Sequence, residues 1–278
     1  MRLVRISQHS HAQNGASRVV RGPLFAALGA LSIGAIALAI PSEAASATTT
    51  VVAPYVDLAG WPTPDLVQTS NSIGTKSLTL AFVTASGSCT PSWGGYAAYE
   101  VGGPGDFSSA INSFRVSGGD PIISFGGANG TELAGACPTT SALTAAYQKV
   151  IERYGANRID FDIEGAAVAN SAENLRRASA VATVQKSRSA KGSPLQVSLT
   201  LPVLPSGLTP DGVRTVREFN NAGVALASVN VMAMDYGPAY TNMGTQALNA
   251  VTSTKAQLRS LPAYAGWSDA QLNALMGV

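Results

Sequence analysis

The sequence predicts an α/β protein that folds as a (β/α)₈ barrel, incomplete at its C-terminus, and three observations support this prediction. Short β-branched or apolar runs alternate with longer helical patterns, which is typical of βαβ units around a parallel sheet. Polar and glycine-rich clusters follow several runs, at the strand ends where barrel enzymes carry their sites. A doubly wound sheet is disfavoured, because residues 58–64 (LAGWPTP) lack the G-x-G-x-x-G turn that would follow its first strand.

The predicted strands and helices alternate along the chain without a disordered linker. The strands are expected at 51–58, 77–85, 121–127, 158–164, 196–203 and 228–236. The helices are expected at 63–73, 107–117, 139–154, 171–190, 210–221 and 244–260. Asp106 and Thr139 or Thr140 suit helix N-caps, and Gly155 suits a C-terminal stop.

The number of units is smaller than a complete barrel requires. The strands recur about every 35 residues, so eight units would extend to roughly residue 330. The chain stops at 275–278, where a seventh strand would begin, so about six βα units are expected and two strands are missing. Either the chain is a fragment of a longer one or the barrel closes in another way. An open barrel leaves unpaired strand edges, and we expect it to be unstable or prone to aggregation.

Residues 1–45 have the pattern of a secretory signal peptide. Four arginines precede an apolar run at 24–40, and small residues follow at 44–47. The alternative is a membrane anchor, since the apolar run lies at the lower limit of a spanning length. We expect cleavage, a mature domain at 46–278, a secreted and extracellular protein, and no membrane contact after cleavage.

Removal of the leader changes the chemistry that the chain can perform. Both histidines, His9 and His11, lie in it, which excludes a Ser-His-Asp triad, a Cys-His pair and a His-ligated zinc from the mature domain. The leader also holds four of the 18 basic residues and one of the 16 acidic residues, so the mature part has a net charge of −1. Since no run of basic residues is present, nucleic acid is not an expected partner.

The two cysteines, Cys89 and Cys137, lie in segments rich in glycine, serine and proline. In an oxidising compartment, two thiols most simply form one disulfide. Closing a loop of this length would stabilise the fold by about 4 kcal/mol on the chain-entropy account.

The sharpest local pattern is the run at 158–164, RIDFDIE, in which apolar and acidic residues alternate. Asp160, Asp162 and Glu164 therefore share one face of a strand, and in a barrel that face points inward. Residues on the same face lie about 6.6 Å apart, so their titrations are coupled. We expect at least one proton to be retained near neutral pH, and a protonated carboxyl can act as a general acid.

Two other interpretations of the acidic face remain. The strand could be antiparallel and half exposed, with its polar face in water, or the carboxylates could bind a cation together with further oxygen ligands. The functional interpretation is favoured, because buried acids at this density cost free energy unless they are paired or have a role.

These residues resemble the signature of the family 18 glycoside hydrolases, the chitinase-like (β/α)₈ barrels, of the secreted bacterial type. Asp160, Asp162 and Glu164 match D-x-x-D-x-D-x-E, with Asn157 at the first position. Two further segments, 124–127 (SFGG) and 229–236 (VNVMAMDY), resemble the motifs of strands 3 and 6 in that family. The resemblance covers roughly residues 51–278.

The resemblance implies a role for each carboxylate. Glu164 would protonate the glycosidic oxygen, and Asp162 would orient the substrate's N-acetyl group while its carbonyl oxygen attacks the anomeric carbon. Asp160 would share a proton with Asp162 and help to raise the effective pKa of Glu164. The substrate supplies the nucleophile, so the reaction retains the anomeric configuration. No histidine, metal or cofactor is expected.

The resemblance also implies a set of substrate-binding residues: Tyr55, Gly126, Gly127, Met232, Asp235 and Tyr236. Many relatives have M-x-Y-D in strand 6, whereas this chain has Met234 followed by Asp235 and Tyr236. Either Tyr236 supplies its phenol from a shifted position, or the acetamido group is bound differently. Tyr55 could equally be a core tyrosine, and the two glycines could simply end a strand.

Aromatic residues in the loop after the second strand, Trp93, Tyr96 and Tyr99, have two interpretations. They could stack on sugar rings or brace the loop beside Cys89, and the second is favoured.

The resemblance implies a chitinase that hydrolyses polymers of β-1,4-linked N-acetylglucosamine, such as chitin or chitooligosaccharides. The alternatives are an endo-β-N-acetylglucosaminidase and a catalytically inactive, chitin-binding barrel.

Overall fold

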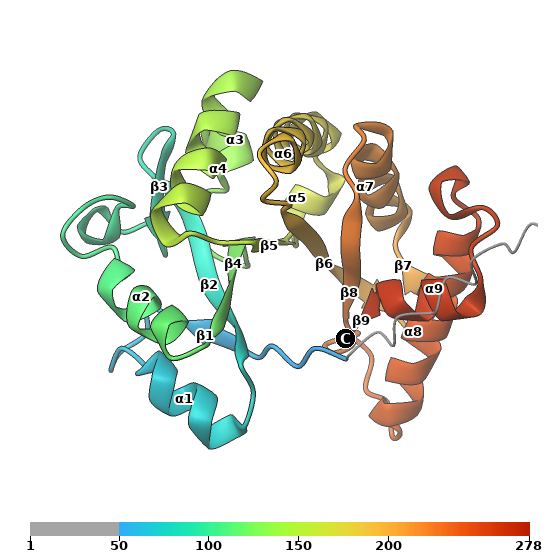
Figure 1. The fold of residues 1–278 in the computed structure, drawn as a ribbon. Coiled ribbons are helices and arrows are strands. Elements are labelled where there is room, and N and C mark those ends of the chain that lie inside the picture. Colours follow the sequence, from blue (N-terminus) through green and yellow to red (C-terminus); the bar gives the residue numbers. More distant parts are fainter. Residues whose placement is uncertain (1–49) are drawn as a thin grey trace, which may run out of the picture. The chain divides into compact units, whose positions relative to one another are not determined.

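The computed structural model of the chain describes residues 50–278. The predicted signal peptide, 1–45, lies outside the described residues. Seven strands lie side by side in one curved parallel sheet (Figure 1). In spatial order they are β1 (Tyr55–Asp57), β2 (Ser77–Ser86), β4 (Asp120–Gly126), β5 (Arg158–Asp162), β6 (Gln196–Leu204), β8 (Leu226–Met232) and β9 (Met276–Gly277).

The sheet is an incomplete (β/α)₈ barrel, as the sequence predicts. All neighbouring strands along this path are parallel, and no pairing joins β9 back to β1 within residues 50–278. The short β9 pairs with β8 through Met276 and Gly277, where the strand count predicts a seventh strand to begin.

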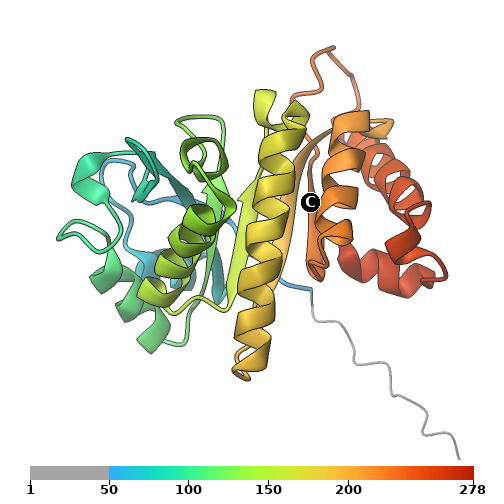
Figure 2. The same cartoon turned by 90° about the horizontal axis from the view of Figure 1, so that it is seen from above.

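Helices cover the outer side of this arc of strands (Figure 1). They are α1 (Leu66–Ile73), α2 (Ser108–Val116), α4 (Thr140–Tyr154), α6 (Ser171–Ala190), α7 (Pro210–Asn221) and α8 (Met243–Arg259). Figure 2 shows α6 between α4 and α7. None of the helices in the described part of the chain has the length and hydropathy needed to cross a membrane.

Several short elements escape prediction from the sequence, because they are too short for a period to be recognised. They are β3 (Thr90–Trp93), β7 (Gly207–Leu208), α3 (Leu133–Ala136), α5 (Ala166–Ala169), α9 (Asp269–Leu275) and the 3₁₀ turns η1 (Ala97–Tyr99) and η2 (Pro262–Tyr264). Strands β3 and β7 form antiparallel extensions of β2 and β6. Most of these elements lie between a strand and the helix that follows it.

The helix caps agree with the sequence at α4 and differ at α2. Thr139 caps α4 by accepting a hydrogen bond from the Ala142 amide at 3.1 Å, and Gly155 ends it in the left-handed conformation. The predicted cap at Asp106 is wrong, because the N-cap of α2 is Phe107.

Asp106 instead organises the loop before α2. Its buried carboxylate accepts hydrogen bonds from the amides of Gly102 and Ser108 and from Arg153 Nε at 2.6 Å. Burial alone would raise its pKa, but these bonds to the charged form lower it to about 2. Asp106 therefore stabilises this loop as an anion.

The outward face of β5 forms part of the core. Ile159 and Phe161 are buried, and the Phe161 ring stacks on that of Phe125 from β4 at 5.2 Å between centroids. Tyr147 from α4 meets both rings edge-on. Because side chains alternate along a strand, this apolar packing turns the intervening carboxylates inward.

The predicted disulfide bond is present, and it joins Cys89 before β3 to Cys137 after α3. Beside it, Trp93 is fully buried, and its indole N–H donates to the Tyr154 hydroxyl at 2.8 Å. Trp93 thus braces the loop, as the favoured interpretation holds, whereas Tyr96 is exposed at the surface.

Candidate active site

A cleft of about 450 Å³ lies where the loops after β4 and β5 face each other. Its lining comes from three segments: Gly127, Ala128, Gly130, Thr131, Glu132 and Gly135 after β4; Glu164, Gly165, Ala166 and Ala167 after β5; and Asn170 and Glu173 at the start of α6. This is the carboxyl-terminal side of the parallel strands, which is where barrel enzymes place their catalytic groups.

Asp160 lies at the centre of the barrel interior, where its residue surface is only 1% exposed. Its Oδ2 accepts hydrogen bonds from the hydroxyls of Tyr55 at 2.9 Å and Ser124 at 2.8 Å. Its Oδ1 accepts from Ser198 at 2.7 Å and Thr200 at 2.9 Å. Burial raises the pKa of Asp160, and the four hydroxyl bonds oppose that rise. These bonds occupy the acceptor capacity of a carboxylate.

The same hydroxyls connect strands that are far apart in the sheet. Tyr55 from β1 lies 2.9 Å from Thr200 of β6, and Asn230 of β8 donates to Thr200 at 3.1 Å. The Tyr55 residue is nevertheless 45% exposed, which does not fit a core tyrosine. Burial of its hydroxyl and the charge of Asp160 raise its pKa, so the phenol stays neutral.

Asp162 is also buried, but its surroundings are different. Its residue surface is 5% exposed, and its Oδ1 has no hydrogen-bond partner among the described residues. Burial, followed by the charges of Asp160, Glu164 and Glu132, raises its pKa to about 8. Asp162 is therefore mainly protonated at neutral pH, as the clustered acids predict.

The proton sharing that the family resemblance implies is not made through a direct contact here. No hydrogen bond joins Asp160 to Asp162 within residues 50–278, and the oxygens of Asp160 are occupied by hydroxyl donors. Asp160 acts on its neighbour through its charge.

Glu164 lies just beyond the end of β5, in the turn that leads into α5. It is half-buried and lines the cleft, and burial raises the pKa of its carboxyl. The structure thus places Asp160 and Asp162 within the barrel and Glu164 at its mouth, where a substrate can approach.

Two glycines at the end of β4, the last residue of the strand and the residue after it, allow β4 and β5 to approach closely. Gly126 has φ +102°, and a Cβ there would lie 2.1 Å from the Asp162 carbonyl oxygen. A Cβ at Gly127 would lie 2.7 Å from the Phe82 ring, and the Gly127 amide donates to that same carbonyl at 2.9 Å. Only glycine fits both positions, and Gly127 also lines the cleft.

The candidates at the end of β8 do not join this constellation. Met232 is half-buried, Asp235 is exposed with φ +48°, and neither lines the cleft. The Tyr236 ring is buried edge-on to Tyr240, and its hydroxyl has no partner among the described residues. The phenol of Tyr236 therefore does not reach the carboxylates in this structure.

Sequence reasoning missed several polar residues of the site. Ser198 and Thr200 alternate with apolar residues along β6, and that alternation was the available signal. Glu132 and Glu173 also line the cleft, and Glu132 forms an ion pair with the fully buried Arg177. No local pattern marks these two acids, since they come from a loop and a helix.

A cation site is not built by these side chains. Among residues 50–278, no three histidine, cysteine or acidic side chains are arranged to hold a metal ion. The oxygens of Asp160 are already hydrogen-bonded to hydroxyls, which disfavours the cation interpretation of the acidic strand.

Two curated proteins are similar to this chain, although no protein-family model matches it. The probable bifunctional chitinase/lysozyme of Escherichia coli K12 is 37% identical over 238 residues, which cover 82% of this chain and 26% of that protein. Endochitinase 11 of Metarhizium anisopliae is 36% identical over 241 residues, covering 82% and 44%. The chain thus spans less than half the length of these relatives.

This chain covers a larger share of two similar solved structures. The catalytic domain of the hyperthermophilic chitinase from Pyrococcus furiosus is 31% identical, with a TM-score of 0.69 over 81% of this chain and 69% of that one. A catalytic-site mutant of active domain 2 of the thermostable Pyrococcus furiosus chitinase, crystallised with chito-oligosaccharides, is 30% identical with a TM-score of 0.67. With this likeness and the matching carboxylate signature, the chain belongs to the chitinase-like family 18 glycoside hydrolases.

Proposed function

We propose that this protein is a chitinase that hydrolyses polymers of β-1,4-linked N-acetylglucosamine. The observation that carries the proposal is the position of Glu164, a half-buried carboxyl with a raised pKa that lines the cleft two residues beyond the protonated Asp162. The names of the relatives support the substrate class, as does the chito-oligosaccharide complex of the Pyrococcus furiosus domain.

Glu164 is the general acid in this proposal. Burial favours its protonated form, so it can give a proton to the glycosidic oxygen as the bond to the anomeric carbon breaks. The resulting carboxylate later takes a proton from the water that attacks the anomeric carbon. One residue thus serves both half-reactions, and the configuration is retained.

Asp162 orients the acetamido group of the substrate. Its Oδ1 lacks a partner in the described residues and can accept a hydrogen bond from the acetamido N–H. That bond directs the acetamido carbonyl oxygen toward the anomeric carbon, where it forms the new bond as the leaving group departs. The substrate thereby acts as the nucleophile, and no cofactor takes part.

Asp160 acts as a fixed charge behind this pair. Its four hydroxyl partners hold it in one orientation, and its charge follows burial as the second cause of the raised pKa of Asp162. Asp160 therefore keeps Asp162 protonated before the substrate binds. Tyr55 stabilises the charge of Asp160 by donating a hydrogen bond to it, and its exposed ring is available to the sugar.

The place of action follows from the leader. We propose that residues 1–45 are a signal peptide and that 46–278 form the catalytic domain, acting outside the cell on its polysaccharide substrate.

A comparison of two cleft carboxylates tests the proposed reaction. Glu164→Gln keeps the size of the side chain but cannot deliver a proton, so kcat on a fluorogenic chitooligosaccharide should fall by about 10³-fold. Glu173→Gln, in the same cleft, serves as the control and should change kcat by less than about threefold. NMR of the first product measures the anomeric configuration, which should be β.

Other outcomes would contradict the proposal in different ways. Full turnover by Glu164→Gln would remove Glu164 from the role of acid. Sugar binding without turnover in the unaltered chain would favour a chitin-binding barrel, and cleavage confined to N-glycans would favour an endo-β-N-acetylglucosaminidase.

A further inference from the structure

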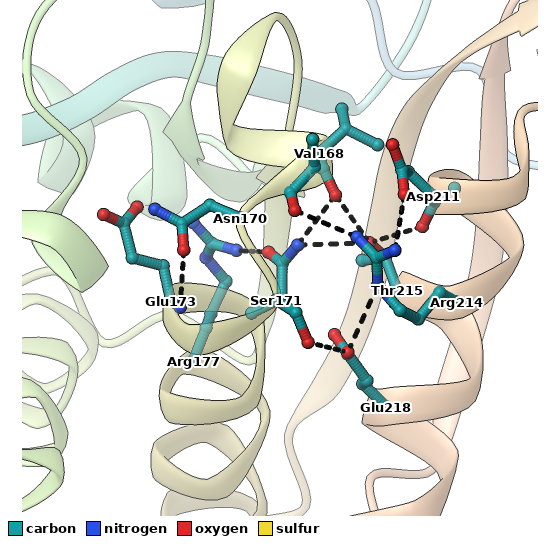
Figure 3. A network of polar contacts seen from close by, with 12 residues as sticks. Val168, Asn170, Ser171, Glu173, Arg177, Asp211, Arg214, Thr215 and Glu218 are labelled. Carbon is teal, nitrogen blue, oxygen red and sulfur yellow. Dashed lines mark hydrogen bonds and ion pairs between the residues drawn. The ribbon is translucent and has the colours of Figure 1, made fainter.

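Side chains of α6 and α7 donate hydrogen bonds to the short helix that follows Glu164. Helix α5 is one turn long, and its Ala167 amide donates to the Glu164 carbonyl at 3.2 Å. Such a short helix cannot satisfy its own final carbonyl groups. Here α6 and α7 supply the donors, so the position of the turn depends on them (Figure 3).

Three successive carbonyl oxygens of α5 receive hydrogen bonds from these helices. Asn174 Nδ2 donates to the oxygens of both Ala167 and Val168 at 3.1 Å. The oxygen of Ala169 accepts from Arg214 Nη2 at 3.0 Å. The carboxamide of Asn174 thus holds the middle of the turn, three to four residues after Glu164.

Asn174 is itself fixed by a buried arginine. Arg177 Nη1 donates to Asn174 Oδ1, and Asn174 Nδ2 also lies 3.2 Å from Thr215 Oγ1. Asn174, Arg177 and Thr215 are all fully buried. Burying an asparagine costs free energy unless its donors and its acceptor are used, and both ends of the Asn174 carboxamide have partners. The carboxamide therefore has one favourable orientation. Arg177 Nε has no partner among the described residues, so Arg177 is held through its two Nη groups.

The arginine connects this network to the other wall of the cleft. Arg177 Nη2 is paired with Glu132, which lines the cleft from the loop after β4. A continuous set of contacts therefore runs from Glu132 through Arg177 and Asn174 to the turn after Glu164. These contacts connect the two walls of the cleft through the buried Arg177 and Asn174.

We propose that Asn174 is a positioning residue for Glu164, and that it fixes the acid by holding α5 while Arg177 and Glu132 fix Asn174. The inference rests on the proposed hydrolysis, because it concerns the placement of the same acid. Asn174 touches no substrate and transfers no proton. Its effect is on the distance and direction from the Glu164 carboxyl to the glycosidic oxygen, to which the rate of proton transfer is sensitive.

Asn174→Asp separates this role from simple packing. The substitution is isosteric and keeps an oxygen for Arg177, but it replaces the Nδ2 donor with an acceptor that faces two carbonyl oxygens. The matched control is Ser171→Ala on the same helix, where the hydroxyl donates to Glu218 Oε1 at 2.6 Å and not to α5. Thr215→Val is a milder second variant, since it removes only the hydroxyl beside Asn174.

The full chain is tested for chitooligosaccharide hydrolysis, at a temperature where circular dichroism shows each variant folded. For Asn174→Asp we expect kcat to fall about tenfold or more with KM changed by less than about twofold, because the acid acts in the transition state. Thr215→Val should lower kcat by a smaller factor in the same manner, and Ser171→Ala should leave both constants unchanged. Unchanged kcat in folded Asn174→Asp would overturn the inference.

Amide hydrogen exchange over residues 164–170 provides a readout that needs no turnover. Asn174→Asp should speed exchange in this segment relative to Ser171→Ala, because the turn loses two of its hydrogen bonds. If the unaltered chain hydrolyses no substrate but Asn174→Asp still speeds exchange, the proposed function is contradicted and the hydrogen bonding of the turn by Asn174 is supported. Unchanged exchange in Asn174→Asp would overturn the inference that Asn174 fixes the turn. If Asn174→Asp fails to fold, Thr215→Val is judged by the same two readouts, the kinetic constants and the exchange.

Discussion

The two ends of β5 show opposite treatments of charge. At the amino end, Arg158 forms an ion pair with Asp120 at 2.8 Å, and Arg188 donates to the Asn157 side chain at 2.8 Å. These groups are partly exposed and meet partners of complementary charge or polarity. At the carboxyl end, three carboxyls follow one another, and none of them forms a salt bridge within the described residues.

The difference shows that buried, unpaired carboxyls, which lower stability, are confined to the carboxyl end of the strand. Paired charges at the amino end support the sheet, whereas burial raises the pKa values of Asp160, Asp162 and Glu164, and the charges of neighbouring carboxyls add to the rise at Asp162. This division matches barrel enzymes in general, in which the amino side of the strands maintains the fold and the carboxyl side carries the reaction. The experiments below compare the two ends.

The largest effect on folding is expected from the buried centre. Asp160→Ala removes the acceptor of four hydroxyls, so the free energy of unfolding should fall by about 3 kcal/mol. Asp120→Ala, at the other end of the sheet, breaks a partly exposed ion pair and should cost at most about 1 kcal/mol. Urea denaturation measures both. Equal losses would mean that the hydroxyl cluster adds no more stability than the surface pair.

The pH dependence of stability should change next most, at Asp162. Its folded pKa of about 8 exceeds the ordinary value of 3.8, so the folded state binds this proton more tightly than the unfolded state. The contribution of Asp162 to stability is therefore fully present at low pH and is lost as the pH rises through about 8. Asp162→Asn cannot titrate, so it should raise the melting temperature by several degrees at pH 8 and by less than about 2 °C at pH 4.

Asp120→Asn is the control for that experiment, because it alters a carboxyl at the paired end of the sheet. Thermal melts across pH 4 to 9 give the comparison. Parallel curves for Asp162→Asn and the unaltered chain would show that the proton on Asp162 is not linked to folding.

A smaller effect is expected at the end of β8. Tyr236→Phe removes a buried hydroxyl that has no partner in the described residues, so stability should change by less than about 0.5 kcal/mol. Tyr264→Phe removes an equally buried hydroxyl that donates to Asn220 at 3.1 Å, and it should cost about 1 kcal/mol. A larger loss for Tyr236→Phe would contradict this expectation and show that the hydroxyl is hydrogen-bonded in the folded protein.

The features that could be predicted from the sequence are those in which apolar residues recur at a regular spacing. The bounds of α6 and α7 match the prediction to the residue, because the helical spacing of apolar residues can be recognised over such long segments. The three carboxyls on one face of β5 followed in the same way from alternation. The strand prediction of 158–164 ran too far, since β5 ends at Asp162 and Glu164 lies in a turn.

Other features depend on contacts between distant parts of the chain. Glu132 and Arg177 are 45 residues apart, and neither sequence neighbourhood indicates that they pair. The position of Tyr236 could not be predicted for a related reason, because beyond the end of β8 the period of the strand no longer determines where a side chain points. Turns and side-chain networks of this kind come from the packed structure rather than from local patterns.

The placement of the tryptophans gives the protein a built-in optical reporter. Trp93 is fully buried, whereas Trp61, in the loop after β1, is 94% exposed. Emission from Trp61 is therefore open to collisional quenching by acrylamide, while that from Trp93 is shielded. With the half-buried Trp267 replaced by Phe, loss of quenching at low acrylamide would report a ligand that covers the β1 loop, and red-shifted, fully quenchable emission would report opening of the core around Trp93 and the disulfide.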